Sequence, residues 1–554
     1  MTFKRSGLWL LLFAYAFVWF ALLGYRPLMH PDEGRYAEIP REMVASGDFV
    51  TPRLDDLKYF EKPPLQYWAT AIAFKVAGEN QWAARFWPGL TGFLTVLLTF
   101  FTARRLYGER VGLYAAAILA STVFLGAMGR MITLDMGFAF FLQLSLTGLL
   151  FANLPDAGAA ARRRWMLVVW AGLALAVLSK GIVALVLGGG VLVGYSVITR
   201  DLSLWRRFEW VRGGLLFLAI TAPWFILVSL RNHEFAYFFF LHEHFARFLS
   251  KVHGRYQPDW YFLALLPPLL LPWTTLVLQG WWRAWRREGA GFQPHWLLGL
   301  WALLVIGFFS LSQSKLTAYI LPMVPALAIL AGRYAEQCSA QALRRHLYAT
   351  LFMPLVIVVA YAIRDRFTDP PTAALMESFL HAALLAAAMV LAGLVCAQWL
   401  FREKAAAQPG QRTKALLVAA IGGFLGVTVL IQGHEPFSRL SSGRDAVAVV
   451  KPLLRDGVPI YSVAMYDQSL PFYLKRTMTL VEYRGELDLG LTQEPEKWVP
   501  TLDAFIERWN RDSDAFAVMS PEVFQSLQAG GFPMQEVVRD ARRVFVRKPQ
   551  VGQP

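Results

Sequence analysis

Long apolar runs separated by short polar connections dominate the chain. Thirteen of these runs approach the roughly 20 residues that a helix needs to cross the hydrocarbon core of a bilayer. They lie near residues 8–24, 86–103, 111–128, 131–152, 166–179, 181–198, 213–230, 260–281, 296–311, 317–332, 347–363, 379–400 and 415–432. The pattern predicts a polytopic α-helical membrane protein with about 13 transmembrane helices. The fifth and sixth runs are short and meet at Lys180, so they are also compatible with one broken element.

Lysine and arginine residues occupy every second connection, starting with Lys4 and Arg5 before the first run. Cytoplasmic loops of membrane proteins carry such an excess of basic residues. With the N-terminus in the cytoplasm, an odd number of spans places everything after residue 432 outside. The long connections 25–85 and 231–259 then also lie on the outer, periplasmic side. This distribution accounts for much of the net charge of +15, so a nucleic-acid partner is not needed to explain it.

Composition supports the membrane assignment. Hydrophobic residues make up 56% of the chain and charged residues only 17%, against about 25% charged residues in soluble domains. The first run continues past Gly24 without a small-residue cleavage site, which predicts an uncleaved span in place of a signal peptide. The two cysteines, Cys338 and Cys396, predict no disulfide framework.

The C-terminal segment, residues 435–554, has more charge and shorter apolar stretches. Predicted strands cover residues 458–463, 478–481, 515–519, 536–538 and 543–547, and predicted helices cover 445–455, 502–509 and 521–527. This alternation predicts a small α/β domain. We therefore expect a transmembrane domain over residues 1–434, which includes both long outer loops, and a periplasmic α/β domain over 435–554. In the first loop, residues 35–47, interrupted by Pro40, and 65–76 predict amphipathic helices in the headgroup plane.

The strongest local signal is the motif His30-Pro31-Asp32-Glu33-Gly34-Arg35-Tyr36, directly after the first run. Two adjacent acids at the membrane edge are costly unless they are paired or used. Other acids, cations and tyrosines occur where runs are predicted to end on the outer face, among them Tyr59, Glu61, Lys62, Asp135, His242, Arg247, Lys315 and Tyr319. Together they predict a site for a charged amphiphile. Singly, each has an ordinary explanation, such as snorkelling of Lys62 and Arg247 or a helix partner for Asp135.

Five segments in order resemble the 4-amino-4-deoxy-L-arabinose lipid A transferases: HPDEGRYAEIPREM, YFEKPPLQYW, TLDM, LSKG and FFSLSQSKLTAYILPMVPALAIL. That family belongs to the protein O-mannosyltransferase-like enzymes of the GT-C fold. The resemblance covers about residues 1–335 and beyond them extends to architecture only. It implies an inverting pentosyltransferase that moves aminoarabinose from undecaprenyl phosphate to a lipid A phosphate of lipopolysaccharide. It also implies the bacterial inner membrane as location and resistance to polymyxin as outcome.

The chemistry of this reaction suggests roles for the motif residues. A phosphate monoester acceptor already carries a charge of about −1.5 to −2, so offsetting the leaving phosphate matters more than a strong base. Lys62 and Arg247 are predicted to bind the donor phosphate. Asp32, Asp135 and Arg35 are predicted to be catalytic, by orienting the reactants. Contacts to sugar or acceptor are predicted for Glu33, Tyr36, Tyr59, Glu61, Lys180, Lys315 and Tyr319.

No cofactor is required by this chemistry, although Glu61 and His242 could ligate a divalent ion, Zn or Mg, with a third ligand from elsewhere. The expected partners are the prenyl-linked donor, lipid A and membrane lipids, and a monomer suffices. Two alternatives remain. A related transferase could glycosylate protein hydroxyls, in which case Asp32 would serve as a base. A lipid-sugar flippase or transporter would more often show repeated halves and polar residues at the midplane, whereas no repeat is visible here.

Overall fold

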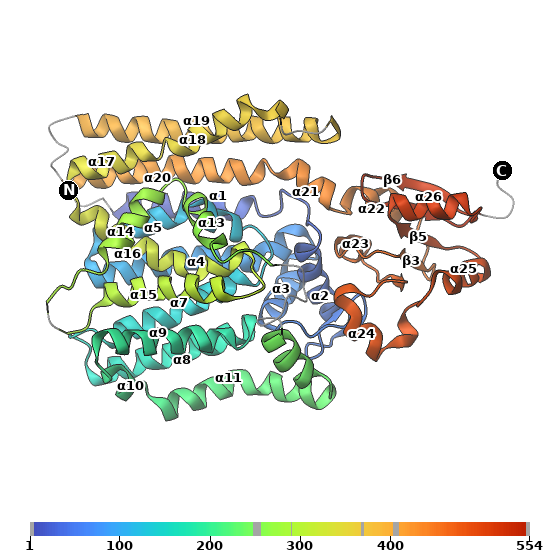
Figure 1. Ribbon diagram of the computed structural model, residues 1–554, viewed down its shortest axis with the longest axis horizontal. Coiled ribbons are helices and arrows are strands. Elements are labelled where there is room, and N and C mark those ends of the chain that lie inside the picture. The colour runs from blue at the N-terminus through green and yellow to red at the C-terminus, as the bar shows by residue number, and fades with distance from the viewer. Residues whose placement is uncertain (1–4, 247–255, 290, 367–369, 403–408, 550–554) are drawn as a thin grey trace. The chain divides into compact units, whose positions relative to one another are not determined.

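The computed structural model describes residues 5–246, 256–289, 291–366, 370–402 and 409–549 (Figure 1). Its contacts divide the chain into two compact units, which we describe separately. The helical unit comprises Met1–Leu23, Glu61–Gln66 and Phe86–Gly433. The α/β unit comprises Gly24–Phe60, Tyr67–Arg85 and His434–Pro554.

Helices follow every apolar run of the helical unit. In chain order they are α1 (Arg5–Ala21), α4 (Gln81–Tyr107), α5 (Glu109–Ala120), α6 (Val123–Met128), α7 (Asp135–Ala152), α8 (Ala159–Lys180), α9 (Val183–Thr199), α10 (Ser203–Arg206), α11 (Trp210–Arg231), α13 (Tyr261–Leu269), α14 (Thr274–Arg283), α15 (Pro294–Leu311), α16 (Val324–Gln337), α17 (Ala340–Ala349), α18 (Phe352–Ala362), α19 (Pro370–Arg402) and α20 (Pro409–Gln432). Short helices of other types are η1 (Tyr237–Ala246, a π-helix), η2 (Thr317–Met323) and η3 (Arg364–Arg366). The first turn of α4 belongs to the α/β unit.

The multi-pass membrane fold is confirmed, but the count of 13 spans is not. Within the described residues, eight helices are long and apolar enough to span a membrane. The number is nine if α13 and α14, between which the chain bends by 118°, form one span. Breaks in the runs explain the difference. Thr122 interrupts one run, because its hydroxyl accepts a hydrogen bond from the Leu125 amide at 3.4 Å and starts α6. The fifth and sixth runs are two helices, because Gly181 takes a φ of 91° between them.

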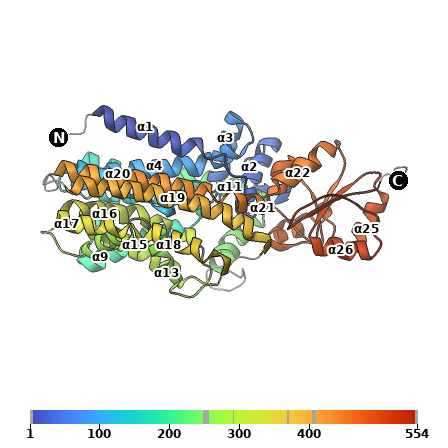
Figure 2. The same ribbon diagram turned by 90° about the horizontal axis from the view of Figure 1, so that it is seen from above.

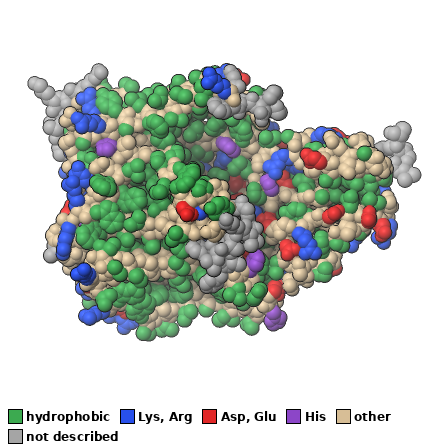
Figure 3. Space-filling view, viewed as in Figure 1, with side chains coloured by type: hydrophobic (Ala, Val, Ile, Leu, Met, Phe, Trp, Pro, Cys, Tyr) green, Lys and Arg blue, Asp and Glu red, His purple; other side chains and the backbone are tan. Residues whose placement is uncertain are grey.

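Small residues bring neighbouring helices together. Helices α19 and α20 lie side by side (Figure 2). A Cβ placed on Gly422 of α20 would lie 2.8 Å from the Cα of Gly393 in α19. Such close backbone approach is the usual means of packing helices in a membrane. In the space-filling view, hydrophobic side chains cover much of the helical unit, and Lys and Arg gather at the end where α10 and α17 lie (Figure 3).

The C-terminal part of the α/β unit is built on a five-stranded sheet of order β4-β3-β5-β7-β6. The strands are β3 (Ile460–Val463), β4 (Thr479–Val481), β5 (Phe516–Met519), β6 (Gln535–Arg539) and β7 (Val544–Arg547). Strand β3 pairs in parallel with β4 and β5, and β7 pairs antiparallel with β5 and β6. All five strands match predicted ones. The core beside the sheet contains Phe505 and Trp509, both fully buried.

Helices of this part include both predicted and unpredicted elements. The three predicted helices form as α22 (Arg444–Val450), α25 (Leu502–Arg511) and α26 (Pro521–Ala529). The unpredicted elements are α21 (Glu435–Ser441), α23 (Ser469–Leu474), α24 (Asp488–Gln493) and the 3-10 turns η5 (Lys451–Leu453), η6 (Gly485–Leu487) and η7 (Pro495–Lys497). The mixture of strands and helices confirms the α/β class.

The first long loop belongs mostly to the α/β unit, whereas we expected it to group with the membrane helices. It contains α2 (Asp32–Ser46), α3 (Leu65–Ala77) and an unpredicted hairpin of β1 (Arg53–Leu54) and β2 (Leu57–Lys58). Helix α2 continues through Pro40 and is buried from Glu33 to Met43. It is therefore an interior helix and not the headgroup-plane helix expected. Burial of Arg41 and Glu38 is tolerated because the two are paired through two hydrogen bonds from Arg41 to Glu38.

Candidate functional site

The predicted site residues fall in both units. The α/β unit holds Asp32, Glu33, Arg35, Tyr36 and Tyr59, and the helical unit holds Glu61, Lys62, Asp135, Lys180, His242, Lys315 and Tyr319. Arg247 lies outside the described residues. The geometry of each group follows in turn.

Lys62 forms an ion pair with a carboxylate that the sequence did not single out. Its Nζ lies 3.3 Å from Oε2 of Glu243 in η1, and it donates a hydrogen bond of 2.8 Å to the carbonyl of Glu61. The Glu243 side chain is only 2% exposed. A carboxylate buried to this degree requires a cation nearby, so Glu243 holds Lys62 in a fixed orientation.

The predicted metal ligands do not assemble a donor set. Zinc sites usually have three or four protein ligands. Among the residues that the structure describes, no three His, Cys, Asp or Glu side chains are close enough to hold a metal ion. Nδ1 of His242 lies 3.6 Å from Oε1 of Glu243, so its described neighbour is the same carboxylate that binds Lys62. We therefore derive no step through a metal.

Asp135, Lys180 and Tyr319 form one cluster in the helical unit. Asp135 begins α7, Lys180 ends α8, and their side chains form an ion pair. Nζ of Lys180 also lies 4.1 Å from the ring centroid of Tyr319. An acid at a helix N-terminus and a cation at a helix C-terminus both complement the helix dipole. The structure thus joins three residues that lie far apart in the sequence.

Lys315 has a structural environment. Its side chain is fully buried, and its Nζ donates a hydrogen bond of 2.8 Å to the carbonyl of Gln257 and lies 3.4 Å from Oδ1 of Asp259. These contacts tie the start of η2 to the segment before α13. This arrangement differs from the contact to sugar or acceptor that the sequence suggested for Lys315, because protein groups surround its ammonium.

Asp32 is exposed and the Arg35 that contacts it is buried, both in the α/β unit. Asp32 is the first residue of α2, and its side chain is 42% exposed. Nη1 of Arg35 lies 3.3 Å from Oδ1 of Asp32, while Nη2 pairs with Glu486 in η6. Arg35 thus contacts Asp32, the other residue of this motif predicted to be catalytic. The partner on the other side, Glu486, carried no sequence signal.

Two tyrosines of the predicted site surround the Arg35 guanidinium. Its Cζ lies 5.5 Å from the ring centroid of Tyr36 and 6.0 Å from that of Tyr59, within the range of cation–π contacts. Both tyrosines are buried, and the Tyr36 ring also packs 6.1 Å from that of Tyr67. Their suggested role as walls of a sugar site stays a prediction.

Glu33 has a structural environment, and its contact to sugar or acceptor stays a prediction. Nε and Nη2 of Arg85 donate hydrogen bonds to its two oxygens at 2.7 and 2.8 Å, and the Met29 amide donates a third at 3.1 Å. Burial acts to raise the pKa of Glu33, but the charges of Arg85 and Arg26 and these hydrogen bonds hold the pKa below its usual value. Glu33 therefore remains an anion that fixes the chain before α2.

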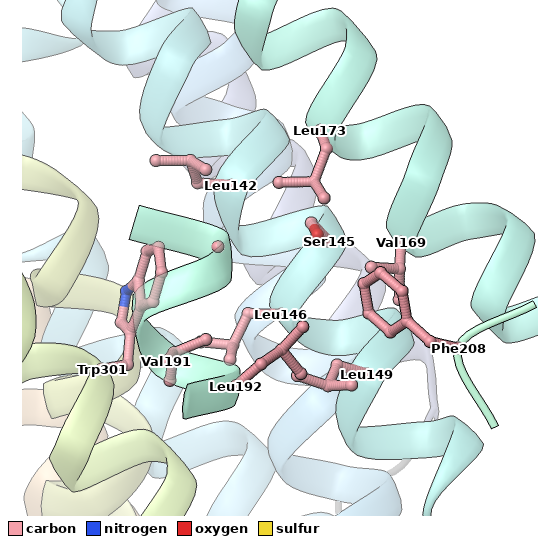
Figure 4. Close-up of a pocket in the computed structure, with 11 residues that line it drawn as sticks. Leu142, Ser145, Leu146, Leu149, Val169, Leu173, Val191, Leu192, Phe208 and Trp301 are labelled. Carbon is pink, nitrogen blue, oxygen red and sulfur yellow. The ribbon is translucent and has the colours of Figure 1, made fainter. Parts of the chain in front are cut away.

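An apolar cavity lies elsewhere in the helical unit. Figure 4 shows its lining side chains, which come mainly from α7, α8, α9 and α15. Ser145 supplies the one hydroxyl among its eleven lining residues. Ten residues of α7 separate Ser145 from Asp135, which corresponds to about 15 Å of helix. The cavity is therefore separate from the charged cluster at the start of α7.

Partners of the predicted residues were harder to find than the residues themselves. Glu243 stood in the segment His242-Glu243-His244, where the flanking histidines drew attention to metal binding. Arg85 lies just before an apolar run, as many basic residues do, and no motif marks Glu486. The available sequence signal for Glu243 was an acid within an aromatic-rich connection between two apolar runs.

Charged groups paired at the ends of membrane helices, together with a C-terminal α/β unit, are the features of a GT-C-type membrane glycosyltransferase. Known families match on both parts. Residues 6–242 match the dolichyl-phosphate-mannose-protein mannosyltransferase family, and residues 446–548 match the aminoarabinose transferase C-terminal domain. The second match reaches the part of the chain where the sequence motifs showed likeness of architecture only.

Relatives over nearly the whole length identify the family. Proteins named undecaprenyl phosphate-alpha-4-amino-4-deoxy-L-arabinose arabinosyl transferase from Pseudomonas aeruginosa (strain UCBPP-PA14) and Pseudomonas paraeruginosa are 33% and 32% identical to this chain. Each alignment covers 91% of this chain and 91% of the relative. The chain belongs to this family of arabinosyl transferases, and the resemblance seen in its motifs is confirmed.

Solved structures agree with this assignment. The crystal structure of ArnT from Cupriavidus metallidurans bound to undecaprenyl phosphate has a TM-score of 0.92 and 37% sequence identity, over 98% of both chains. The archaeal oligosaccharyltransferase AglB from Archaeoglobus fulgidus has a TM-score of 0.50 at 12% identity, over 95% of this chain and 71% of that one. The second likeness concerns the fold alone and agrees with the GT-C class.

Proposed function

We propose that this chain transfers 4-amino-4-deoxy-L-arabinose from undecaprenyl phosphate to a phosphate of lipid A. The observation that carries the proposal is the full-length match to arabinosyl transferases, joined to the likeness to a relative solved with undecaprenyl phosphate. In this proposal the chain lies in the bacterial inner membrane, with its N-terminus in the cytoplasm and its C-terminal segment in the periplasm. The product carries less negative charge, so cationic peptides such as polymyxin bind it less well.

The reaction is a single displacement at the anomeric carbon. An oxygen of the lipid A phosphate forms a bond to this carbon, and the bond from the carbon to the undecaprenyl phosphate oxygen breaks. The bonding electrons leave with undecaprenyl phosphate, so the configuration at the sugar inverts. No proton has to move when the acceptor is a phosphate dianion, because the leaving phosphate takes over the charge that the acceptor loses. The protein must therefore align two anions and stabilise the charge on the leaving group.

Lys62 is the described cation best suited to the donor phosphate. Glu243 already fixes its direction, which lowers the entropy lost when a phosphate binds. A phosphate oxygen can share the ammonium with Glu243, because lysine has three donors. Arg247, predicted to be the second phosphate ligand, follows Glu243 by four residues in the sequence and stays part of the proposal.

The cluster of Asp135, Lys180 and Tyr319 is suited to an amino sugar. The carboxylate of Asp135 can bind the ammonium group of aminoarabinose, and the Tyr319 ring offers an apolar face to the pyranose. The ion pair with Lys180 holds this carboxylate in a fixed orientation until the sugar binds. In the α/β unit, Asp32 remains accessible enough to orient a reactant, and Arg35 keeps it in place.

The proposal requires no metal, because lysine and arginine can neutralise the leaving phosphate. Transfer by the purified protein should continue in EDTA. Loss of transfer in EDTA that Zn or Mg restores would contradict this point and would make Glu61 and His242 ligands after all.

Mass spectrometry of lipid A tests the function. The chain would be expressed in a polymyxin-sensitive strain that makes the donor lipid and lacks its own transferase. We expect lipid A to gain one aminoarabinose with the chain present, and to stay unmodified with Lys62→Ala present at the same membrane level. Unmodified lipid A in both cases would contradict the proposed acceptor, and a glycosylated protein would favour hydroxyl acceptors instead.

A further inference from the structure

A continuous set of hydrogen bonds joins the motif before and within α2 to the C-terminal part of the α/β unit. Nδ1 of His30 lies 2.5 Å from Oε1 of Gln468, Nε2 of Gln468 donates to Oε1 of Glu486 at 2.5 Å, and Nη2 of Arg35 pairs with Oε2 of Glu486. The set ends at Asp32, through the 3.3 Å contact of Nη1 of Arg35. These contacts run without a gap from the exposed carboxylate of Asp32 back to His30.

The directions of these bonds are fixed by chemistry. Glu486 accepts with both oxygens, so the Gln468 amide must turn its nitrogen toward Glu486 and its oxygen toward His30. His30 then donates from Nδ1, as a neutral ring can. Burial acts first to lower the pKa of His30, and the result is a pKa below its ordinary value, in agreement with a neutral ring.

Close packing holds the two parts of this set together. A Cβ on Gly34 of α2 would lie 2.5 Å from the backbone of Gln468 and Ser469, at the start of α23. Only glycine allows this approach. The side chains of Arg35 and Gln468 are buried, so neither is directed into solvent.

We infer that Glu486 is a positioning residue for the transfer reaction: it holds one end of the Arg35 guanidinium and leaves the Asp32 carboxylate available to a reactant. The inference rests on the function proposed above. Asp32 receives only one contact from Arg35 and remains 42% exposed. An arginine without a second partner tends to bind a carboxylate through both nitrogens. With Glu486 removed, Arg35 would engage both oxygens of Asp32 and withdraw them from the reactant.

The C-terminal segment thereby gains a role in the reaction. It supplies Glu486 and Gln468, whereas Asp32 and Arg35 come from the first loop. The inferred role acts through Arg35, so Glu486 itself need not touch either substrate. A change at Glu486 should then affect turnover more than donor affinity.

Glu486→Gln tests the inference, because it keeps the shape and the bond from Gln468 but removes the charge. We expect kcat to fall about tenfold, with KM for the donor within about twofold of the unchanged chain. Glu486→Asp, which restores the charge, should recover part of the loss. The matched control is Glu494→Gln in the same unit: Glu494 is 12% exposed against 15% for Glu486, and it pairs with Arg53 from the first loop. Its kcat should stay unchanged.

A double-mutant cycle separates positioning from mere structure. If Glu486 acts through Arg35, Glu486→Gln should lower kcat much less in an Arg35→Lys background than in the unchanged chain. Equal losses in both backgrounds, an unchanged kcat for Glu486→Gln, or an equal loss for Glu494→Gln would overturn the inference. The proposed function is tested apart from it, by transfer in the unchanged chain and its loss in Lys62→Ala.

Discussion

The two units treat buried charge differently. In the helical unit, predicted site residues form small groups around one acid: Lys62 and His242 lie beside Glu243, and Lys180 pairs with Asp135. In the α/β unit, charges join in longer sets such as the one from Asp32 to His30. Apolar surroundings make an unmatched charge very costly, so each acid of the helical unit is expected to lie beside a cation. A unit with more backbone donors and polar neighbours can hold unequal numbers of acidic and basic side chains.

An excess of acid in the α/β unit illustrates this point. Glu38 is bound by Arg41, whereas the nearby Glu42 accepts hydrogen bonds from the backbone amides of Asp55 and Asp56 at 2.6 and 2.9 Å. Burial, and then the charge of Glu38, raise the pKa of Glu42 well above its usual value. Burial raises the pKa of Asp55 in the same way. Here backbone amides, in place of cations, contact part of the acidic groups.

The largest effect is expected from breaking the Lys62 pair. Lys62→Ala removes the cation proposed for the leaving phosphate and leaves Glu243 without its described counter-ion. Loss of one such electrostatic group costs about 10²–10³-fold in rate. Transfer measured in proteoliposomes should fall by this factor, and the Lys62→Arg variant should retain part of the transfer activity. Lys75→Ala on α3, which removes a lysine beside the ring of Phe49, serves as control and should transfer normally.

Asp32→Asn should have the next largest effect. It keeps the size of the side chain but removes the charge that orients the reactant and pairs with Arg35. We expect kcat to fall about 100-fold while KM for the donor changes little, the pattern of a group that acts in the transition state. The exposed Asp503→Asn should leave kcat unchanged. A normal kcat in Asp32→Asn would remove Asp32 from the reaction.

A double-mutant cycle on Asp135 and Lys180 tests the same comparison through the free energy of unfolding. We expect a coupling of about 1–3 kcal/mol between Asp135→Asn and Lys180→Met, because each single change leaves a buried charge unmatched. The exposed pair of Arg105 and Asp156 in the same unit is the control and should couple by less than about 1 kcal/mol. Thermal unfolding of the whole chain in detergent measures both. Equal couplings would contradict the proposed cost of burial.

The smallest effect concerns Asp55. Its pKa is raised in the folded chain, so between the unfolded value near 3.8 and the raised value the folded state binds more protons, and stability falls as pH rises. Asp55→Asn removes this loss while its amide oxygen can still accept the Met478 amide. We expect a gain of about 1 kcal/mol at pH 8 and less at pH 4.5. Unfolding of both proteins at the two pH values measures the effect, and an equal gain at both would contradict it.

Apolar length and periodicity predicted most helices and strands correctly. A bilayer forces long apolar segments to be helices, so all thirteen runs are helical, and alternation located the five strands of the C-terminal sheet. The number of spans was not predictable, because local features such as the Thr122 cap end helices within a run. The order of the sheet and the grouping of the first loop depend on contacts between distant segments.

The sequence predicted residues of the candidate site but not the contacts between them and their partners. Motif letters pointed to Asp32, Arg35 and Lys62, yet Glu243 and Glu486 come from distant segments without a distinctive pattern. Adjacent acids look alike in a sequence, so the different environments of Glu33 and Asp32 were not predictable. Only packing shows that Arg85 occupies both oxygens of one acid while its neighbour Asp32 stays accessible.

Reconstituted transfer is the most direct test of the central claim. The purified full chain and its Lys62→Ala variant would be placed in liposomes with undecaprenyl phosphate-linked aminoarabinose and lipid A, and the products analysed by mass spectrometry. We predict lipid A that carries one aminoarabinose, with release of undecaprenyl phosphate, and no detectable product from the folded Lys62→Ala variant. Modified lipid A at similar rates from both proteins, or none from the unchanged chain, would contradict the account.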